Sequence, residues 1–356
     1  MHNHRPLRDA TRSKPRAGFF RYNCLMRISC AFPPLPDTPR HIELAERLGF
    51  HTAWVYDTPA LQLDVWMTLA LAAVRTDLIV LGPGVLIPSL RHPMVTASAI
   101  AHLVSLVGED RVVIGLGTGF TGRRAMGQKP LRWADIPEHV GVVQRLLRGE
   151  TVAVEGRMTK MLHGDGQAPA RPIGVRWVLG VNGPKGLATA RELGLGVFTT
   201  NPRTNPSDAG VPTATMLAFG TVIRPGESVD ALRVLETGGP GAAVAYHALL
   251  EQDASRLAAL ANGARFVELV NATPEATRHL VLHEGHLTTL NDIDRQVVTA
   301  QSVSSFTPLT GTAEELRERV AALESAGLTE VAFQPMGDIE DELHAMADAL
   351  APWMGS

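Results

Sequence analysis

The stretch Leu-Ile-Val-Leu-Gly-Pro-Gly-Val-Leu-Ile-Pro, residues 78–88, decides the fold class of this chain. Its apolar run from Leu78 to Ile87 predicts a strand buried on both faces, as strands of parallel sheets are. Gly82 and Gly84 lie inside this strand, where glycine lowers stability and marks a bulge or a close backbone contact. Two explanations stay open: the bulge serves only to close a barrel, or it lies at the carboxyl end of a barrel strand and serves a ligand.

Outward from this stretch, short apolar runs alternate with segments of helical periodicity. The strands are predicted at residues 26–32, 52–56, 78–87, 111–116, 177–181, 197–200, 214–223 and 330–334. The helices are predicted at residues 39–49, 63–74, 94–107, 135–148, 185–193, 313–326 and 339–350, with a hairpin at 150–163 and a long helical region between about 229 and 300. This count predicts a (β/α)₈ barrel with insertions after strands 4 and 7, rather than an open doubly wound sheet.

Composition excludes several classes of protein. The 356 residues carry a net charge of −3, which argues against a nucleic-acid binder. Cys24 and Cys30 are too few for a disulfide scaffold, and the apolar runs are too short for a membrane span. With no signal-peptide pattern, we expect a cytoplasmic protein. Residues 1–25 hold six basic residues and one acid, so we expect a flexible extension before a single domain at 26–356.

Gly117, Gly119 and Gly122 match the GxGxxG dinucleotide fingerprint after a strand. The context does not fit, because no apolar helix follows and no strand ends in an acid about twenty residues later. A glycine-rich turn that lets the backbone approach a ligand is the better interpretation.

Other strand ends also carry candidate binding groups. Asp57 ends the second strand, where it either bonds a ligand or begins a turn. Arg91 either reaches an anion or caps a loop. At Asn182-Gly183-Pro184-Lys185 a strand meets a helix whose first N–H groups, with a rare lysine, suit a phosphate. An ordinary capped loop explains the same residues equally well.

Histidines cluster at His279, His283 and His286, beside Glu284. The sequence predicts no metal site there, because no HExxH motif is present and a full ligand set is missing. A histidine from this insertion instead suits an acid that closes over a pocket. A Ser/His/Asp hydrolase is disfavoured because no GxSxG turn occurs.

From Met26 onward the chain resembles the bacterial luciferase-like monooxygenase superfamily, especially the methylenetetrahydromethanopterin reductase-like oxidoreductases that use the deazaflavin coenzyme F420. The matching blocks, in the order of that family, are Asp57, Gly84 to Pro88, Arg91-His92-Pro93, Gly115 to Gly119, Arg145 to Gly156, Gly183-Pro184-Lys185, Gly311-Thr312 and Gly327 to Val331.

The resemblance implies a flavin-like ring at the carboxyl-terminal mouth of the barrel, backed by a non-proline cis peptide, here Gly84–Val85. It implies a phosphate near Asn182, Gly183, Pro184 and Lys185, and places Asp57 toward the ring. The turn Gly117-Thr118-Gly119 would allow close approach, and Trp54 and Phe32 would supply aromatic walls.

Two residues of this chain depart from the pattern of that family. Many relatives have histidine after the strand-two aspartate, where this chain has Thr58, and sugar-phosphate dehydrogenases have glutamate at the place of Phe120. The candidates for a proton donor are Thr58, His283 and His286.

We therefore expect an F420-dependent oxidoreductase that acts on a small organic substrate and forms a homodimer, without nucleic-acid or membrane partners. An FMN-dependent monooxygenase and a catalytically silent flavin- or deazaflavin-binding protein are the alternatives.

Overall fold

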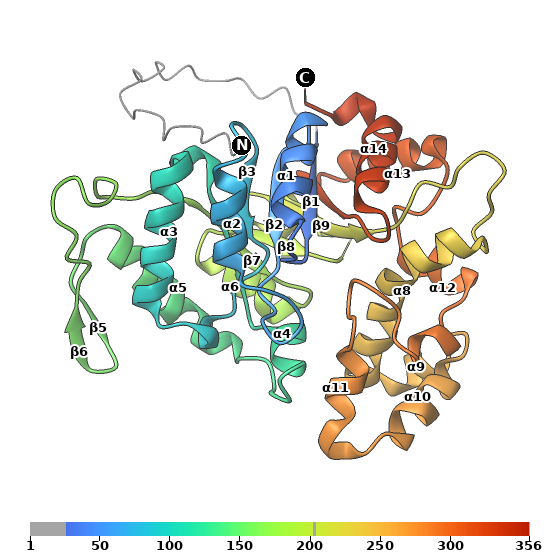
Figure 1. Cartoon of the computed structure of the whole chain (residues 1–356). Coiled ribbons are helices and arrows are strands. Elements are labelled where there is room, and N and C mark those ends of the chain that lie inside the picture. Colours follow the sequence, from blue (N-terminus) through green and yellow to red (C-terminus); the bar gives the residue numbers. More distant parts are fainter. Residues whose placement is uncertain (1–25, 202–203, 356) are drawn as a thin grey trace, which may run out of the picture.

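Parallel strands form a barrel in the computed structural model, which describes residues 26–201 and 204–355 (Figure 1). In the described residues the large sheet has the order β3-β2-β1-β10-β9-β8-β7-β4. Parallel bridges from Leu81 to Val112 and from Leu86 to Leu116 join its two outer strands. The predicted barrel is confirmed, with strands β1 (Arg27–Phe32), β2 (Thr52–Val55), β3 (Val80–Pro83), β4 (Val113–Gly117), β7 (Arg176–Gly180), β8 (Gly196–Thr199), β9 (Ala214–Phe219) and β10 (Glu330–Gln334).

Helices follow most strands and cover the outside of the barrel (Figure 1). Local signals start several of them: the side chain of Asp64 accepts the N–H groups of Trp66 and Met67, and Thr312 forms a capping box with Glu315. Between β8 and β9 the described residues form one short helix, α7 (Pro206–Ala209). The longer covering helices are α1 (Thr38–Arg47), α2 (Val65–Ala73), α3 (Pro93–Val107), α5 (Ile136–Leu147), α6 (Pro184–Glu192), α13 (Ala313–Ser325) and α14 (Ile339–Ala349).

The two predicted insertions are present. The segment after β4 holds α4 (Phe120–Arg124), α5 and the antiparallel hairpin β5 (Val152–Val154) and β6 (Arg157–Thr159). The segment after β9 is the helical group beside the barrel, coloured from yellow to orange-red in Figure 1: α8 (Leu232–Gln252), α9 (Ala254–Ala258), α10 (Gly263–Ala272), α11 (Arg278–His283) and α12 (Ala300–Phe306). An ion pair between Arg124 and Glu251 links the two insertions.

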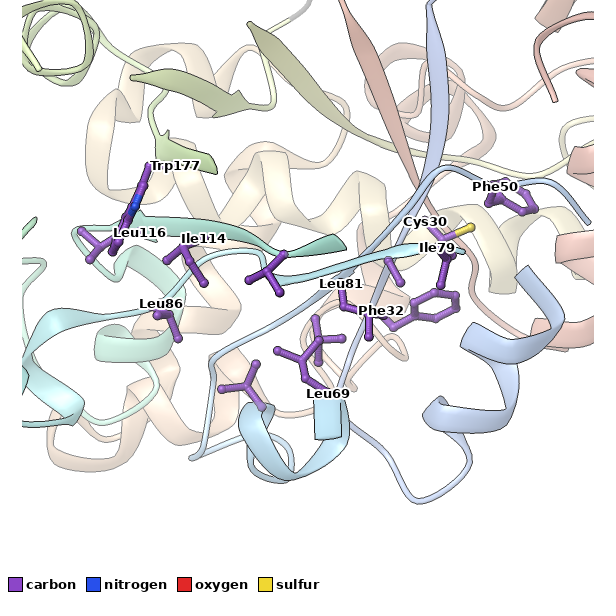
Figure 2. Packing of buried hydrophobic residues seen from close by; sticks show 14 of the residues in the cluster. Cys30, Phe32, Phe50, Leu69, Ile79, Leu81, Leu86, Ile114, Leu116 and Trp177 are labelled. Atoms are coloured by element: carbon purple, nitrogen blue, oxygen red, sulfur yellow. The ribbon is translucent and has the colours of Figure 1, made fainter. Parts of the chain in front are cut away.

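The hydrophobic core has an outer and an inner part. The outer part lies between strands and helices, where Figure 2 shows Phe32 and Leu81 facing the helix that carries Leu69. The inner part fills the barrel, with the rings of Trp54 and Phe198 at 4.9 Å. Phe32 and Trp54 are therefore core residues, and the prediction that they line the ligand pocket is wrong: Phe32 faces the covering helices, and Trp54 packs inside the barrel against Phe198.

The third strand differs from its prediction in length. β3 ends at Pro83, and the Gly84–Val85 peptide bond that follows is cis, as the resemblance implies. A Cβ at Gly82 would lie 2.0 Å from the carbonyl oxygen of Val113, so this glycine allows β3 and β4 to meet. A Cβ at Gly84 would instead meet the Cβ of Trp54 at 2.9 Å. Gly82 therefore allows the barrel to close, and Gly84 allows the bulge after β3 to pack against Trp54 in the barrel core.

The predicted extension at residues 1–25, with Cys24, lies outside the described residues, while Cys30 is a free, buried thiol. None of the helices in the described ranges combines the length and the apolar character that crossing a bilayer needs.

We expect Gly82→Ala to destabilise the protein by about 3 kcal/mol or more, because the added methyl group meets a backbone oxygen that cannot move aside. Urea unfolding followed by circular dichroism measures this. The matched control is Gly141→Ala in α5, where the new Cβ meets nothing within 4 Å; it should leave stability unchanged or raise it by about 0.5–1 kcal/mol. Equal effects of the two substitutions would refute the closure role of Gly82.

Candidate active site

A pocket opens at the carboxyl ends of the barrel strands, where active sites of this architecture lie. It encloses about 890 Å³, its open mouth included, and its lining is mostly apolar. The predicted residues that line it are Asp57, Thr58, Gly84, Val85, Gly117, Thr118, Gly119, Asn182 and His286. The sequence thus brings residues from four strand ends and one insertion to a single cavity.

The floor of the pocket is built around the side chain of Val85. A Cβ at Gly117 or at Gly180 would lie 2.9 Å from Val85 Cγ2, and one at Gly115 would lie 2.7 Å from Val85 Cγ1. Gly117 is predicted to allow close approach of a ligand, and the structure shows that it first makes room for Val85. Gly119, with φ of +77°, starts α4 and turns the chain along the wall.

The carboxylate of Asp57 holds the bulge from the side. It accepts hydrogen bonds from Arg91 Nη1 at 2.8 and 2.9 Å and from the N–H of Ile87 at 3.1 Å. Burial raises the pKa of Asp57, and the Arg91 guanidinium opposes that shift. Arg91 also reaches Asp64 at 3.0 Å, so of its two interpretations the structure supports loop anchoring. The Asp57 carboxylate is engaged by the protein, and its direction toward a bound ring remains a prediction.

The candidate phosphate site lies at the rim. Asn182 Oδ1 accepts hydrogen bonds from Thr199 Oγ1 at 3.0 Å and from the N–H of Thr200 at 2.9 Å, which ties the end of β7 to the end of β8. α6 starts at Pro184, as predicted. Gly183, Pro184 and Lys185 are exposed and stand outside the pocket lining, so a ligand has to extend over the rim to reach them.

Other residues at the pocket are not predicted from the sequence. The hydroxyl of Tyr56 donates to Gln334 Oε1, and the Gln334 amide donates to the carbonyl of Leu287. Phe198 and Leu217 complete the apolar surface. Tyr56 and Phe198 stand at strand ends, which is a usable sequence signal, whereas nothing local points to Leu287 in the helical insertion.

The histidine candidates have adjacent rings but line different cavities. His286 lines the pocket, with Nε2 3.5 Å from Thr121 Oγ1, whereas His283 lines a neighbouring depression with His279. Burial lowers the pKa of His286 well below its usual value and that of His283 to about 4, so both are neutral at pH 7. His247 of α8, absent from the sequence analysis, packs against both rings.

Comparison with known proteins agrees with this geometry. Residues 17–330 match the luciferase-like monooxygenase family, and the chain belongs to that family. It is 29% identical to the 5,10-methylenetetrahydromethanopterin reductase of Archaeoglobus fulgidus over 83% of this chain and 89% of that protein. It is 33% identical to the F420-dependent glucose-6-phosphate dehydrogenase of Nakamurella multipartita, over 44% of this chain and 50% of that protein.

Among solved structures, the coenzyme F420 dependent tetrahydromethanopterin reductase of Methanopyrus kandleri superposes with a TM-score of 0.63. The match covers 92% of this chain and 99% of the other, at 21% identity. This likeness shows the shared barrel fold.

We expect Arg91→Met to destabilise the protein by about 3 kcal/mol, because it leaves the Asp57 carboxylate buried without its charged partner. Chemical denaturation measures the loss. The double variant with Asp57→Asn should recover part of it, and Asp64→Asn, at the more exposed end, should cost less than about 1 kcal/mol. An Arg91→Met protein of unchanged stability would show that Arg91 does not anchor the loop.

Proposed function

We propose that the protein is an F420-dependent oxidoreductase that transfers a hydride between the deazaflavin C5 and a small organic substrate. The observation that carries this proposal is the near full-length similarity to a methylenetetrahydromethanopterin reductase, together with a pocket over the Gly84–Val85 bulge. The names of the other relatives support the same cofactor. None of these similarities identifies the substrate, because the residues of the pocket walls vary widely within one fold.

The pocket fits a flat ring system. Its floor is Val85 between glycines, which presents a smooth apolar surface, and Phe198 and Leu217 add apolar area. Gly117, Thr118 and Gly119 line one side of the pocket, where the edge of a bound ring would meet them. At the rim, the first N–H groups of α6 and the Lys185 ammonium suit the phosphate.

When bound, the deazaflavin supplies the hydride chemistry, and the chain supplies position and a dry surrounding. Leu61, Phe120 and Leu287 cover the pocket from the two insertions and the strand-two loop. A substrate heteroatom that gains or loses charge needs a proton partner. Thr58 and His286 line the pocket, so we propose them for this exchange, His286 through Nε2; His283 stands too far to the side for direct contact.

Absorbance titration should show deazaflavin binding that is at least about tenfold tighter than FMN binding. Stopped-flow mixing of the F420-loaded protein with candidate reductants and oxidised substrates should show absorbance changes of hydride transfer. Tighter FMN binding would reassign the protein as an FMN-dependent monooxygenase, and binding without any turnover would support the silent carrier.

The matched variants Lys185→Ala and Lys160→Ala test the phosphate position in the same titration. Both lysines are exposed, but Lys160 follows the β5–β6 hairpin. Lys185→Ala should weaken F420 binding about three- to tenfold, as expected for one solvent-exposed charge contact. Lys160→Ala should leave binding unchanged. Equal effects of the two substitutions on F420 binding would contradict a phosphate position at the start of α6.

We also propose a homodimer that forms through α2. Met67, Leu71, Val74 and Leu78 form an apolar stripe on and just beyond this helix, with Met67 70% and Leu78 80% exposed. Side chains at i and i+4 share one helix face, and a contiguous exposed apolar face indicates association.

Light scattering should give a mass of twice 38.2 kDa, and Leu71→Glu should yield monomers. Leu162→Glu, at a leucine of the segment after β4 that is even more exposed (86% against 55% for Leu71), should leave the dimer intact. A monomeric wild-type protein would contradict this proposal.

A further inference from the structure

Three buried histidines converge beside the pocket. His247 comes from the middle of α8, His283 ends α11, and His286 follows in the next turn. Their side chains belong to residues only 4%, 4% and 6% exposed. One ring nitrogen of each lies within 4.8 Å of the other two. We refer to these three residues as the histidine cluster.

The backbone is shaped to bring the rings together. The N–H of His286 donates to the carbonyl of His283 at 3.1 Å, and Gly285 and Leu287 on either side of His286 both have positive φ. The side chain of Asn291 then secures the turn, because Nδ2 donates to the carbonyl of Leu282 while Oδ1 accepts the N–H of Asp294. A left-handed non-glycine residue such as Leu287 is uncommon and indicates a constraint on this turn.

Hydrogen bonds within the histidine cluster leave one nitrogen unexplained. His247 Nε2 contacts Asp294 Oδ1 at 2.9 Å, and His247 Nδ1 contacts His286 Nδ1 at 3.1 Å. A chain of neutral hydrogen bonds accounts for these two rings. It does not account for His283 Nδ1, which is buried and has no hydrogen-bond partner among residues 26–201 and 204–355. A buried nitrogen without a hydrogen-bond partner lowers stability. A bound group that accepts one nitrogen lone pair from each of the three histidines explains the position of His283 better than hydrogen bonds alone.

The spacing suits a metal ion. Zn–N bonds of about 2.0–2.1 Å at tetrahedral angles place ligand nitrogens about 3.3 Å apart and imidazole centroids about 5 Å apart. The contact between His247 Nδ1 and His286 Nδ1 is 3.1 Å, and the three centroid separations are 5.2, 5.4 and 5.9 Å. The rings therefore form a tripod that needs only small shifts to bind an ion.

The surroundings also match a metal centre. Metal-bound histidines usually donate their other N–H to a carboxylate, as His247 does to Asp294. Asp294 is buried, and its carboxylate accepts this hydrogen bond from the imidazole of His247. A nearby cation would offset this buried negative charge. The ring of Phe266 stacks against that of His247 at a centroid distance of 5.8 Å, so this ligand has an apolar neighbour.

We propose that His247, His283 and His286 bind a divalent transition-metal ion of the zinc type, with Asp294 as the positioning carboxylate. Neutral imidazoles without thiolates suit Zn²⁺ and its first-row neighbours rather than Mg²⁺ or Ca²⁺. The ion ties α8 to the turn that carries His286 and Leu287, and thereby fixes one wall of the pocket. Binding at Nδ1 of His286 leaves Nε2 directed toward Thr121, so this site stands independently of the proposed cofactor.

Tag-free protein, stripped with a chelator and titrated with Zn²⁺ against a competing chromophoric chelator, should bind about one ion per chain with submicromolar affinity. Co²⁺ in its place should give the intense visible bands of a tetrahedral site. His283→Ala should abolish stoichiometric binding, and Asp294→Asn should weaken it about 10- to 100-fold. Zn²⁺ should raise the melting temperature of the wild type and not that of His283→Ala.

The matched control is His279→Ala, in the same segment but outside the histidine cluster, which should bind Zn²⁺ as the wild type does. His283 is the chosen ligand because its removal creates no unpaired carboxylate, so the metal-free variant should fold. A wild type without stoichiometric Zn²⁺ or Co²⁺ binding, or a His283→Ala protein that binds both normally, would overturn the proposal in favour of a hydrogen-bonded histidine chain. Neither result depends on whether the protein uses F420.

Discussion

The close approach of β3 to β4 is the constraint on which the site depends. Gly82 lies so near the carbonyl of Val113 that no larger residue fits, and this contact closes the barrel where the regular pairing of β3 ends. The chain then leaves the sheet as a bulge that directs Val85 inward among Gly115, Gly117 and Gly180. Closure of the barrel and the shape of the pocket floor thus depend on the same close contacts, which glycines on three neighbouring strands make possible.

Polar contacts then hold this bulge in one position. The Asp57–Arg91 pair joins the end of β2 to the loop after β3, and Asn182 joins β7 to β8. Both sets use buried or rim-side hydrogen bonds, which are directional and leave a pocket of defined shape. Residues that look like ligand-binding groups in the sequence therefore position the backbone first. The surface available to a ligand is therefore mostly the apolar lining between these polar side chains.

The helical insertion completes the pocket from outside the barrel. It has its own apolar core around Tyr246 and Phe266, and the ion pair from Arg124 to Glu251 joins it to the insertion after β4. Its contribution to the pocket is the segment with His286 and Leu287. Because that segment also carries His283, the histidine cluster and the pocket wall share one piece of backbone.

The sequence by itself determined the barrel, the positions of both insertions and most of the pocket floor. These follow from apolar periodicity and from glycines inside strands, which are local signals. The tertiary structure alone decided that Trp54 and Phe32 belong to the core, that Arg91 binds Asp57, and that His247 meets His283 and His286. Such contacts join residues 34 or more positions apart, and no local pattern encodes them, because they depend on how separately folded segments pack.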